Sequence, residues 1–137
     1  MSSKLKLLST KPALVDLSLL LIRILAGGFI LSHGLGKLQK LINGDFTFAD
    51  PLGVGPEASL ILTVFAEIIC AFFIVIGLFT RFMAAPLIIT MLVIIFIVHK
   101  TDDFGHKELA YFYLINYIVI FLSGAGKYSV DKLLLKK

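Results

Sequence analysis

Four ionisable side chains stand where long apolar runs of the sequence begin or end. His33 and Lys37 are one helical turn apart at the end of the first run, His99 ends the third run, and Glu108 begins the fourth. A histidine can change its charge near neutral pH, and a nearby carboxylate can orient its ring and tune its proton affinity. A set of this kind could bind a polar headgroup or pass protons.

The same residues allow plainer interpretations. Lysine, histidine and glutamate often line a membrane interface with their charged ends in water, without forming any site. A metal or haem site has little support, because the histidines are not closely spaced and the chain has no CxxCH motif. The sharper hypothesis is a pocket for a quinone-type headgroup, in which His33 is mostly buried and is the central proton-exchanging group.

These residues belong to a very apolar chain. Hydrophobic residues make up 58% of its 137 residues and charged residues 16%, and the mean hydropathy is +0.98. A soluble globule of this size could not bury so much apolar surface, so the expected solvent is a lipid bilayer. The runs are continuous and do not alternate, which favours helices over strands. The single cysteine, Cys70, allows neither an intrachain disulfide nor a CxxC motif.

Four stretches are long enough to cross the hydrocarbon core of a membrane, with their flanks included for the shorter ones. They cover about residues 13–35, 58–78, 82–98 and 109–122. The sequence therefore predicts an all-α protein, an integral membrane four-helix bundle that forms one domain over residues 1–137.

The charges outside these spans predict the orientation. The side that holds both termini carries eight basic and two acidic residues, and the opposite side carries four basic and six acidic residues. By the positive-inside rule, both termini lie in the cytoplasm. The net charge of +4 then reflects topology and attraction to anionic lipid, and nucleic acid is not an expected partner.

Two charged residues lie inside the spans. Arg23 follows Leu14 by nine residues and Glu67 precedes Leu78 by eleven, so both lie about 14–16 Å from the same membrane surface. A charge at this depth costs about 2.5–3.5 kcal/mol even on lenient scales. We expect Arg23 and Glu67 to form a structural ion pair between neighbouring helices. A proton or substrate relay through the same two residues is the alternative.

Three segments resemble the DoxX family of small four-helix membrane proteins. They are RILAGGFILSHGLGKL, FAEIICAFFIVIGLFTR and ELAYFYLINYIVIFLSGAGKYSVD, in that order over almost the whole chain. The resemblance implies a four-helix bundle in the bacterial cytoplasmic membrane, and some relatives are associated with quinone-linked oxidoreductases or membrane redox complexes. It gives no position an established catalytic role. The positions that match the family motifs are Arg23, His33, Gly34, Lys37, Glu67, Gly77, Arg81, Gly124, Gly126 and Asp131.

From these features we expect a multi-pass protein of the bacterial inner membrane that assists quinone-linked redox chemistry at the non-cytoplasmic side, together with membrane redox proteins. In that role His33, Lys37, His99 and Glu108 would bind the quinone headgroup or pass its protons. The chain has no Rossmann glycine fingerprint, cysteine cluster or haem motif, so it would be at most an accessory subunit with no intrinsic cofactor.

Two other classes of function remain open at this point. One is a non-catalytic structural or assembly subunit of a larger membrane complex. The other is a transporter of small solutes or lipids, which the short chain disfavours unless it forms a homo-oligomer.

The charge asymmetry predicts where reporter fusions will be active. Fusions at either terminus should report the cytoplasm, and a cysteine placed in the loop 43–56 should react with an impermeant thiol reagent added outside the cell. Termini on opposite sides of the membrane would contradict a four-span topology.

Overall fold

The computed structural model describes residues 9–136, and this part of the chain contains helices and loops but no strand. The labels η1 and η2 mark π-helical turns within longer helices. The elements in chain order are α2 (Pro12–Ile42), α3 (Pro56–Val64), η1 (Phe65–Cys70), α4 (Ala71–Ile76), α5 (Thr80–Val93), η2 (Ile94–Val98), α6 (Phe104–Ser123) and α7 (Val130–Leu135).

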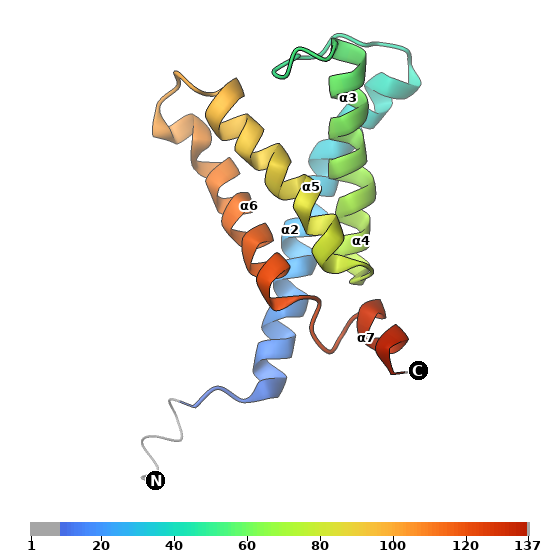
Figure 1. Cartoon of the computed structure of the whole chain (residues 1–137), viewed down its shortest axis with the longest axis vertical. Helices are drawn as coiled ribbons and strands as arrows, with labels where there is room; N and C mark the ends of the chain where they lie inside the picture. Colours follow the sequence, from blue (N-terminus) through green and yellow to red (C-terminus); the bar gives the residue numbers. More distant parts are fainter. Residues whose placement is uncertain (1–8, 137) are drawn as a thin grey trace.

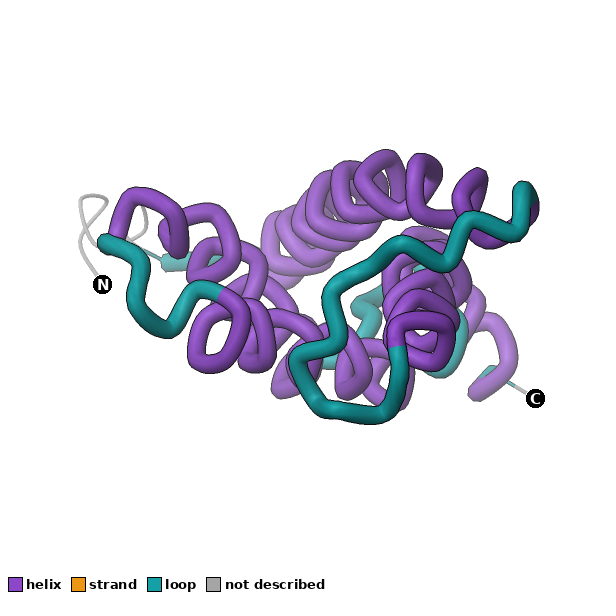
Figure 2. The backbone as a smooth tube through the Cα atoms, turned by 90° about the horizontal axis from the view of Figure 1, so that it is seen from above, coloured by secondary structure: helices purple, strands orange, loops and turns teal. Residues whose placement is uncertain are grey.

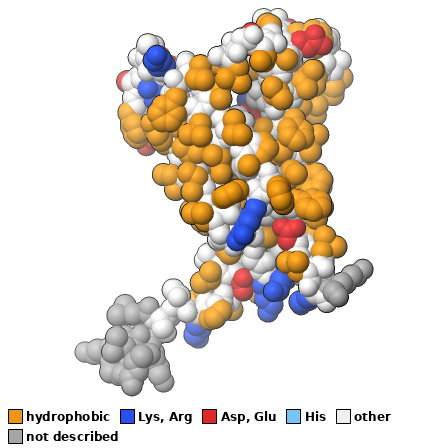
Figure 3. All heavy atoms as spheres, viewed as in Figure 1, with side chains coloured by type: hydrophobic (Ala, Val, Ile, Leu, Met, Phe, Trp, Pro, Cys, Tyr) orange, Lys and Arg blue, Asp and Glu red, His pale blue; other side chains and the backbone are white. Residues whose placement is uncertain are grey.

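Three helical stretches are long and apolar enough to cross a membrane. They are α2 with 31 residues, Pro56–Ile76 with 21 residues and Thr80–Val98 with 19 residues. Hydrophobic side chains cover the middle of the face shown in Figure 3, and basic side chains gather at its lower end. The 20-residue α6 covers the fourth predicted span, but it begins with a polar segment and carries Asn116 and three tyrosines. A fourth crossing by α6 therefore stays a prediction.

The helices form two groups that spread apart toward one end of the molecule. In Figure 1, α2 runs beside α3 and α4, and α5 runs beside α6. The start of α2 and all of α7 lie at one end, here called the terminal end. The loops 43–55 and 99–103 lie at the other, here called the loop end, where Figure 2 shows the longer loop crossing the ends of the helices. Which side of the membrane each end faces stays a prediction.

Arg23 ties three segments together at the terminal end. Its side chain is 1% exposed. Its guanidinium donates to the carbonyl oxygens of Ile74 at 3.0 Å and Val75 at 3.0 Å, in the last turn of α4. It also donates to the carbonyls of Ala125 at 2.5 Å and Tyr128 at 2.9 Å, in the loop after α6. A cation at a helix C-terminus is favoured by the helix dipole and by the unpaired carbonyls there.

The predicted ion pair between Arg23 and Glu67 is wrong. Spans one and two are neighbours, as expected, but Gly34, and not Arg23, lies against Glu67. Since Gly34 follows Arg23 by eleven residues, the two side chains are separated by about 16 Å along the helix. α2 extends beyond the end of α4 at the terminal end. Two residues that are equally many positions from the ends of their apolar runs therefore do not lie at the same height in the bundle.

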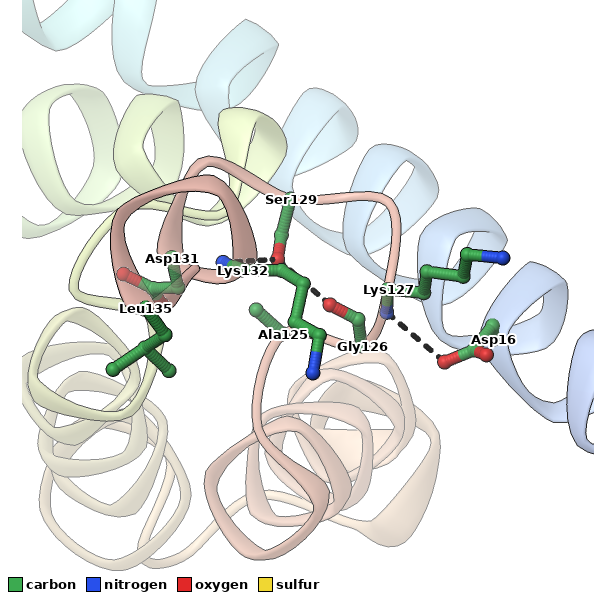
Figure 4. Close-up of a pocket in the computed structure, with 8 residues that line it drawn as sticks. All are labelled: Asp16, Ala125, Gly126, Lys127, Ser129, Asp131, Lys132 and Leu135. Carbon is green, nitrogen blue, oxygen red and sulfur yellow. Dashed lines mark hydrogen bonds between the residues drawn. The ribbon is translucent and has the colours of Figure 1, made fainter. Parts of the chain in front are cut away.

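The loop after α6 closes the terminal end through its own polar groups. Figure 4 shows the backbone N–H of Lys127 donating to Asp16 of α2, at 2.9 Å, and Ser129 joined to Gly126 and Lys132. Asp131 accepts from the backbone N–H groups of Phe79 at 2.7 Å and Thr80 at 3.0 Å. A carboxylate from the C-terminal segment therefore caps the N-terminus of α5.

Gly77 makes the turn between α4 and α5 possible. Its φ of 74° lies in the left-handed region, and the N–H of Leu78 bonds back to Phe73 at 2.9 Å, as in a Schellman motif. A Cβ at this position would lie 2.6 Å from the Cβ of Ser129 and 2.8 Å from the Arg23 guanidinium. A larger residue would therefore displace the groups that close the terminal end.

We expect Gly77→Ala to lower the free energy of unfolding by at least about 2 kcal/mol, because left-handed backbone strain and overpacking add. Denaturant titration of the purified protein in detergent, followed by circular dichroism, measures this change. The matched control is Gly28→Ala, since a Cβ at Gly28 meets nothing within 4 Å. Equal stability of the two variants would contradict this account of Gly77.

Candidate functional site

A buried ion pair lies between α2 and the π-helical turn η1. The Lys37 ammonium contacts the two carboxylate oxygens of Glu67 at 2.7 and 2.6 Å. The Glu67 side chain is 1% exposed and that of Lys37 is 29% exposed. Buried charges require such partners, because an unpaired charge in an apolar interior is very costly. The partner of the Glu67 carboxylate is therefore Lys37 and not Arg23.

Local backbone features bring this pair together. Glu67 lies in the segment FAEIIC, which forms the π-helical turn, and such turns inside α-helices are frequent at functional sites. Gly34 lets α2 approach closely, since a Cβ on it would lie 2.9 Å from the Cβ of Glu67 and 2.9 Å from Ile68. Lys37 follows Gly34 by three residues and so lies on nearly the same face of α2.

A cavity lined by both polar and apolar side chains opens beside the pair at the loop end. It has a volume of 210 Å³, and Lys37 and Glu67 both contribute to its wall. The other lining residues are Ile30, His33, Met91, Ile94, His99, His106, Leu109, Ala110 and Tyr113. We call this space the histidine cavity, because all three histidines of the sequence line it.

The predicted site residues are only partly brought together. His33, Lys37 and His99 line the histidine cavity, and the ring of His33 meets that of Tyr113 on α6 edge to face, with centroids 6.5 Å apart. His33 is exposed, however, and not mostly buried as predicted. Glu108 is also exposed and is not among the cavity residues, so its predicted place in this pocket is wrong.

The reason for the position of Glu108 is helical geometry. The cavity residues of α6 are His106, Leu109, Ala110 and Tyr113, which share one helical face. Glu108 follows His106 by two residues, and residues with that spacing do not face each other. His106 and Glu67 were not among the predicted headgroup ligands, although the spacing of His106 and Tyr113 places them on one face.

Two of the histidines are paired with acidic residues. Nδ1 of His99 lies 2.6 Å from a carboxylate oxygen of Asp102, and Nδ1 of His106 contacts Asp103. The hydrogen bond with His99 holds the pKa of Asp102 below its usual range. Because an ionised Asp102 can only accept a hydrogen bond, Nδ1 of His99 must donate it. A neutral His99 then carries its lone pair on Nε2.

A second cavity also borders the ion pair. It has a volume of 330 Å³ and is also lined by Lys37 and Glu67. Its remaining walls are mostly apolar and come from α3, α5, η2 and the loop 43–55: Phe48, Ala49, Pro51, Leu52, Ser59, Leu62, Thr63, Ile89, Thr90, Val93, Ile94 and Val98. We call this space the apolar cavity.

Asp50 fastens the loop that forms one wall of the apolar cavity. Its carboxylate accepts from the backbone N–H groups of Val54 at 3.0 Å and Gly55 at 2.9 Å, and from the Ser59 hydroxyl at 2.9 Å. Desolvation of this carboxyl raises its pKa, but the hydrogen bonds outweigh that effect and hold the pKa below its usual range. Asp50 is thus ionised at neutral pH and keeps the loop against α3.

Within residues 9–136, no group of three or more histidine, cysteine, aspartate or glutamate side chains is placed to hold a metal ion. The side chains of the ion pair have chemistry of their own. Lys37 can donate hydrogen bonds, Glu67 can accept them, and both groups can exchange protons.

The ion pair predicts strong coupling between Lys37 and Glu67. Lys37→Met alone should lower the free energy of unfolding by about 3–5 kcal/mol, because it leaves a buried charge without its partner, and Lys37→Met with Glu67→Gln should recover most of this loss. Denaturant titrations of the two single variants and the double variant measure the coupling.

A double-mutant cycle with Arg23→Met in place of Lys37→Met is the matched control. Since Arg23 and Glu67 are not partners, Arg23→Met and Glu67→Gln should add to within about 0.5 kcal/mol. Additivity in the Lys37 cycle, or coupling in the Arg23 cycle, would contradict the pairing described here.

The comparisons with known proteins agree with the fold. The family model described as DoxX matches residues 18–100, which include Arg23, the Lys37–Glu67 pair and the turn at Gly77. No curated protein and no solved structure matches the chain. Because the matched segment covers more than half of the sequence, the chain belongs to the DoxX family and is a membrane protein of the DoxX type.

Proposed function

We propose that this chain is an inner-membrane subunit that binds a quinone-type ring beside the Lys37–Glu67 pair and works with a partner redox protein. The observation that carries the proposal is the pairing of the buried Glu67 carboxylate with the partly exposed Lys37, beside two cavities that both residues line. The cost of burying the carboxylate is repaid only in part by its attraction to the ammonium. A pair held open to two cavities, when apolar residues could fill the same volume, suggests a binding role.

The apolar cavity suits the ring of such a ligand. Its volume of 330 Å³ falls in the range of small-molecule sites, about 300–1,000 Å³. Leu62, Ile89 and Val93 supply apolar walls, and the ion pair supplies polar groups at one side. Ligand sites commonly combine mainly hydrophobic walls with a few polar groups that fix orientation.

The hydrogen-bonding groups match both redox states of a quinone. A quinone carbonyl needs a donor, which the Lys37 ammonium provides, and a quinol hydroxyl needs an acceptor, which the Glu67 carboxylate provides. The hydroxyls of Thr63 and Thr90 donate to the carbonyls of Ser59 and Pro86, so toward a ligand they offer only lone pairs. Electrons would be supplied or removed by the partner protein.

A structural or assembly subunit is the second candidate. It is favoured by the terminal end, where Arg23 and Asp131 use several hydrogen bonds to fix three helices and the C-terminal segment. Such an end presents a rigid surface to a larger complex and needs no ligand.

Purification from native membranes in mild detergent separates the two candidates. We expect a redox protein and bound quinone to co-purify with the wild-type chain. Val93→Phe, which would narrow the apolar cavity, should lower the retained quinone about tenfold, which corresponds to about 1.4 kcal/mol of binding free energy. Lys100→Gln is the matched control, since Lys100 lies at the same end but lines neither cavity. A large assembly without redox proteins or quinone would support the structural subunit instead.

A further inference from the structure

The ion pair borders two cavities with different linings. Lys37, Glu67 and Ile94 line both the histidine cavity and the apolar cavity. Three imidazole rings line the histidine cavity, and the apolar cavity has none. A ligand in the apolar cavity would therefore meet the same ion pair that lines the histidine cavity.

Glu67 has few partners for a buried carboxylate. Its two oxygens accept only from Lys37 among the bonds found in residues 9–136. Arg23, by contrast, donates to four backbone carbonyls. Because the ionised state of Glu67 depends on one flexible ammonium, displacement of that ammonium would favour the neutral carboxylic acid.

The histidine cavity offers a route between Glu67 and the loop end. His106 is 68% exposed and His99 is 33% exposed, so the route begins at side chains that water reaches. The pairing with Asp102 leaves Nε2 of His99 as the basic atom. The cavity, with a volume of 210 Å³, is also large enough to hold several water molecules.

We propose that Glu67 is a proton-transfer residue, and that protons pass between it and the loop end through the histidine cavity. A proton from water binds Nε2 of His99 and crosses the cavity to a carboxylate oxygen of Glu67, which leaves the imidazole neutral again. The carboxylic acid then releases the Lys37 ammonium, which can donate to a ligand in the apolar cavity. One proton moves and no electron is transferred; the use of this proton by a ligand rests on the proposed function.

Several charged or titratable groups line the cavity with Glu67 or interact with it. Lys37 and His33 come from α2, His99 from the end of η2, and His106 and Tyr113 from α6. The buried Tyr117 of α6 also interacts electrostatically with Glu67. Positive charge on the histidines opposes the uptake of a proton by Glu67.

Time-resolved infrared spectroscopy after a downward pH jump tests the proposal on the purified full-length protein without added quinone. The carboxylic-acid band of Glu67 is identified by its loss in Glu67→Gln. We expect the band to grow about a hundredfold more slowly in His99→Ala, the loss typical when a positioned proton donor is removed. External imidazole should restore part of the rate, which it would not do if His99 were merely structural.

Two further variants complete the test. Asp102→Asn keeps the imidazole but removes the carboxylate that holds its Nδ1. It should therefore slow the growth of the band less than His99→Ala does, and it covers the case in which His99→Ala fails to fold. Lys100→Gln, at the same end but outside the cavity, should leave the rate unchanged.

The proposal would be overturned if wild-type Glu67 stayed ionised at every pH at which the protein is folded, or if the rate were unchanged in both His99→Ala and Asp102→Asn. It would also be overturned if Thr63→Val slowed the growth of the band and these two variants did not, because the route would then pass through the apolar cavity. Because no quinone is present, these outcomes leave the proposed function standing. Absence of quinone from the purified protein, in turn, leaves the proton route standing.

Discussion

An ionisable side chain inside an apolar bundle must find its partners within the protein, and this constraint shapes both ends of the molecule. Arg23 donates hydrogen bonds to backbone carbonyls of α4 and of the loop after α6. Those bonds fix the height of α2 against α4 and hold the C-terminal segment in place. Asp131 in that segment caps α5, so the position of a third helix depends on the same cluster.

The helices could be predicted from apolar length, but their relative heights could not. Each predicted span lies within a helix or ends within a few residues of one, because continuous apolar runs can close their backbone hydrogen bonds only in helices. The pairing of Arg23 with Glu67 failed because close contacts at Gly27 and Gly34 set the register between α2 and the next helix. Such contacts depend on side chains of both helices, and counting residues from one end of each span does not reveal them.

The candidate site was predictable where helical spacing alone decides which residues share a face. His33 and Lys37 are four residues apart and line one cavity, and the end of η2 brings His99 to it. Glu108 fails the same spacing rule against His106 and Tyr113, which the sequence could have revealed. The sequence pointed to Glu67 as a buried charge, in an ion pair or a relay with Arg23. Its contact with Lys37 could not be foreseen, because it depends on the register of α2 and on a π-helical turn that no sequence pattern indicated.

The two ends therefore meet the same constraint with different consequences. At the terminal end, Arg23, Gly77 and Asp131 take part in hydrogen bonds or close contacts that a substitution would break. At the loop end, Gly34, Lys37 and Glu67 form a pair that faces two cavities and leaves hydrogen-bonding capacity unused. The Arg23 guanidinium is held by four backbone carbonyls, whereas Lys37 and Glu67 bond only to each other among the described residues and keep hydrogen-bonding capacity for a ligand or a proton. This difference is the reason we propose the chemistry at the loop end.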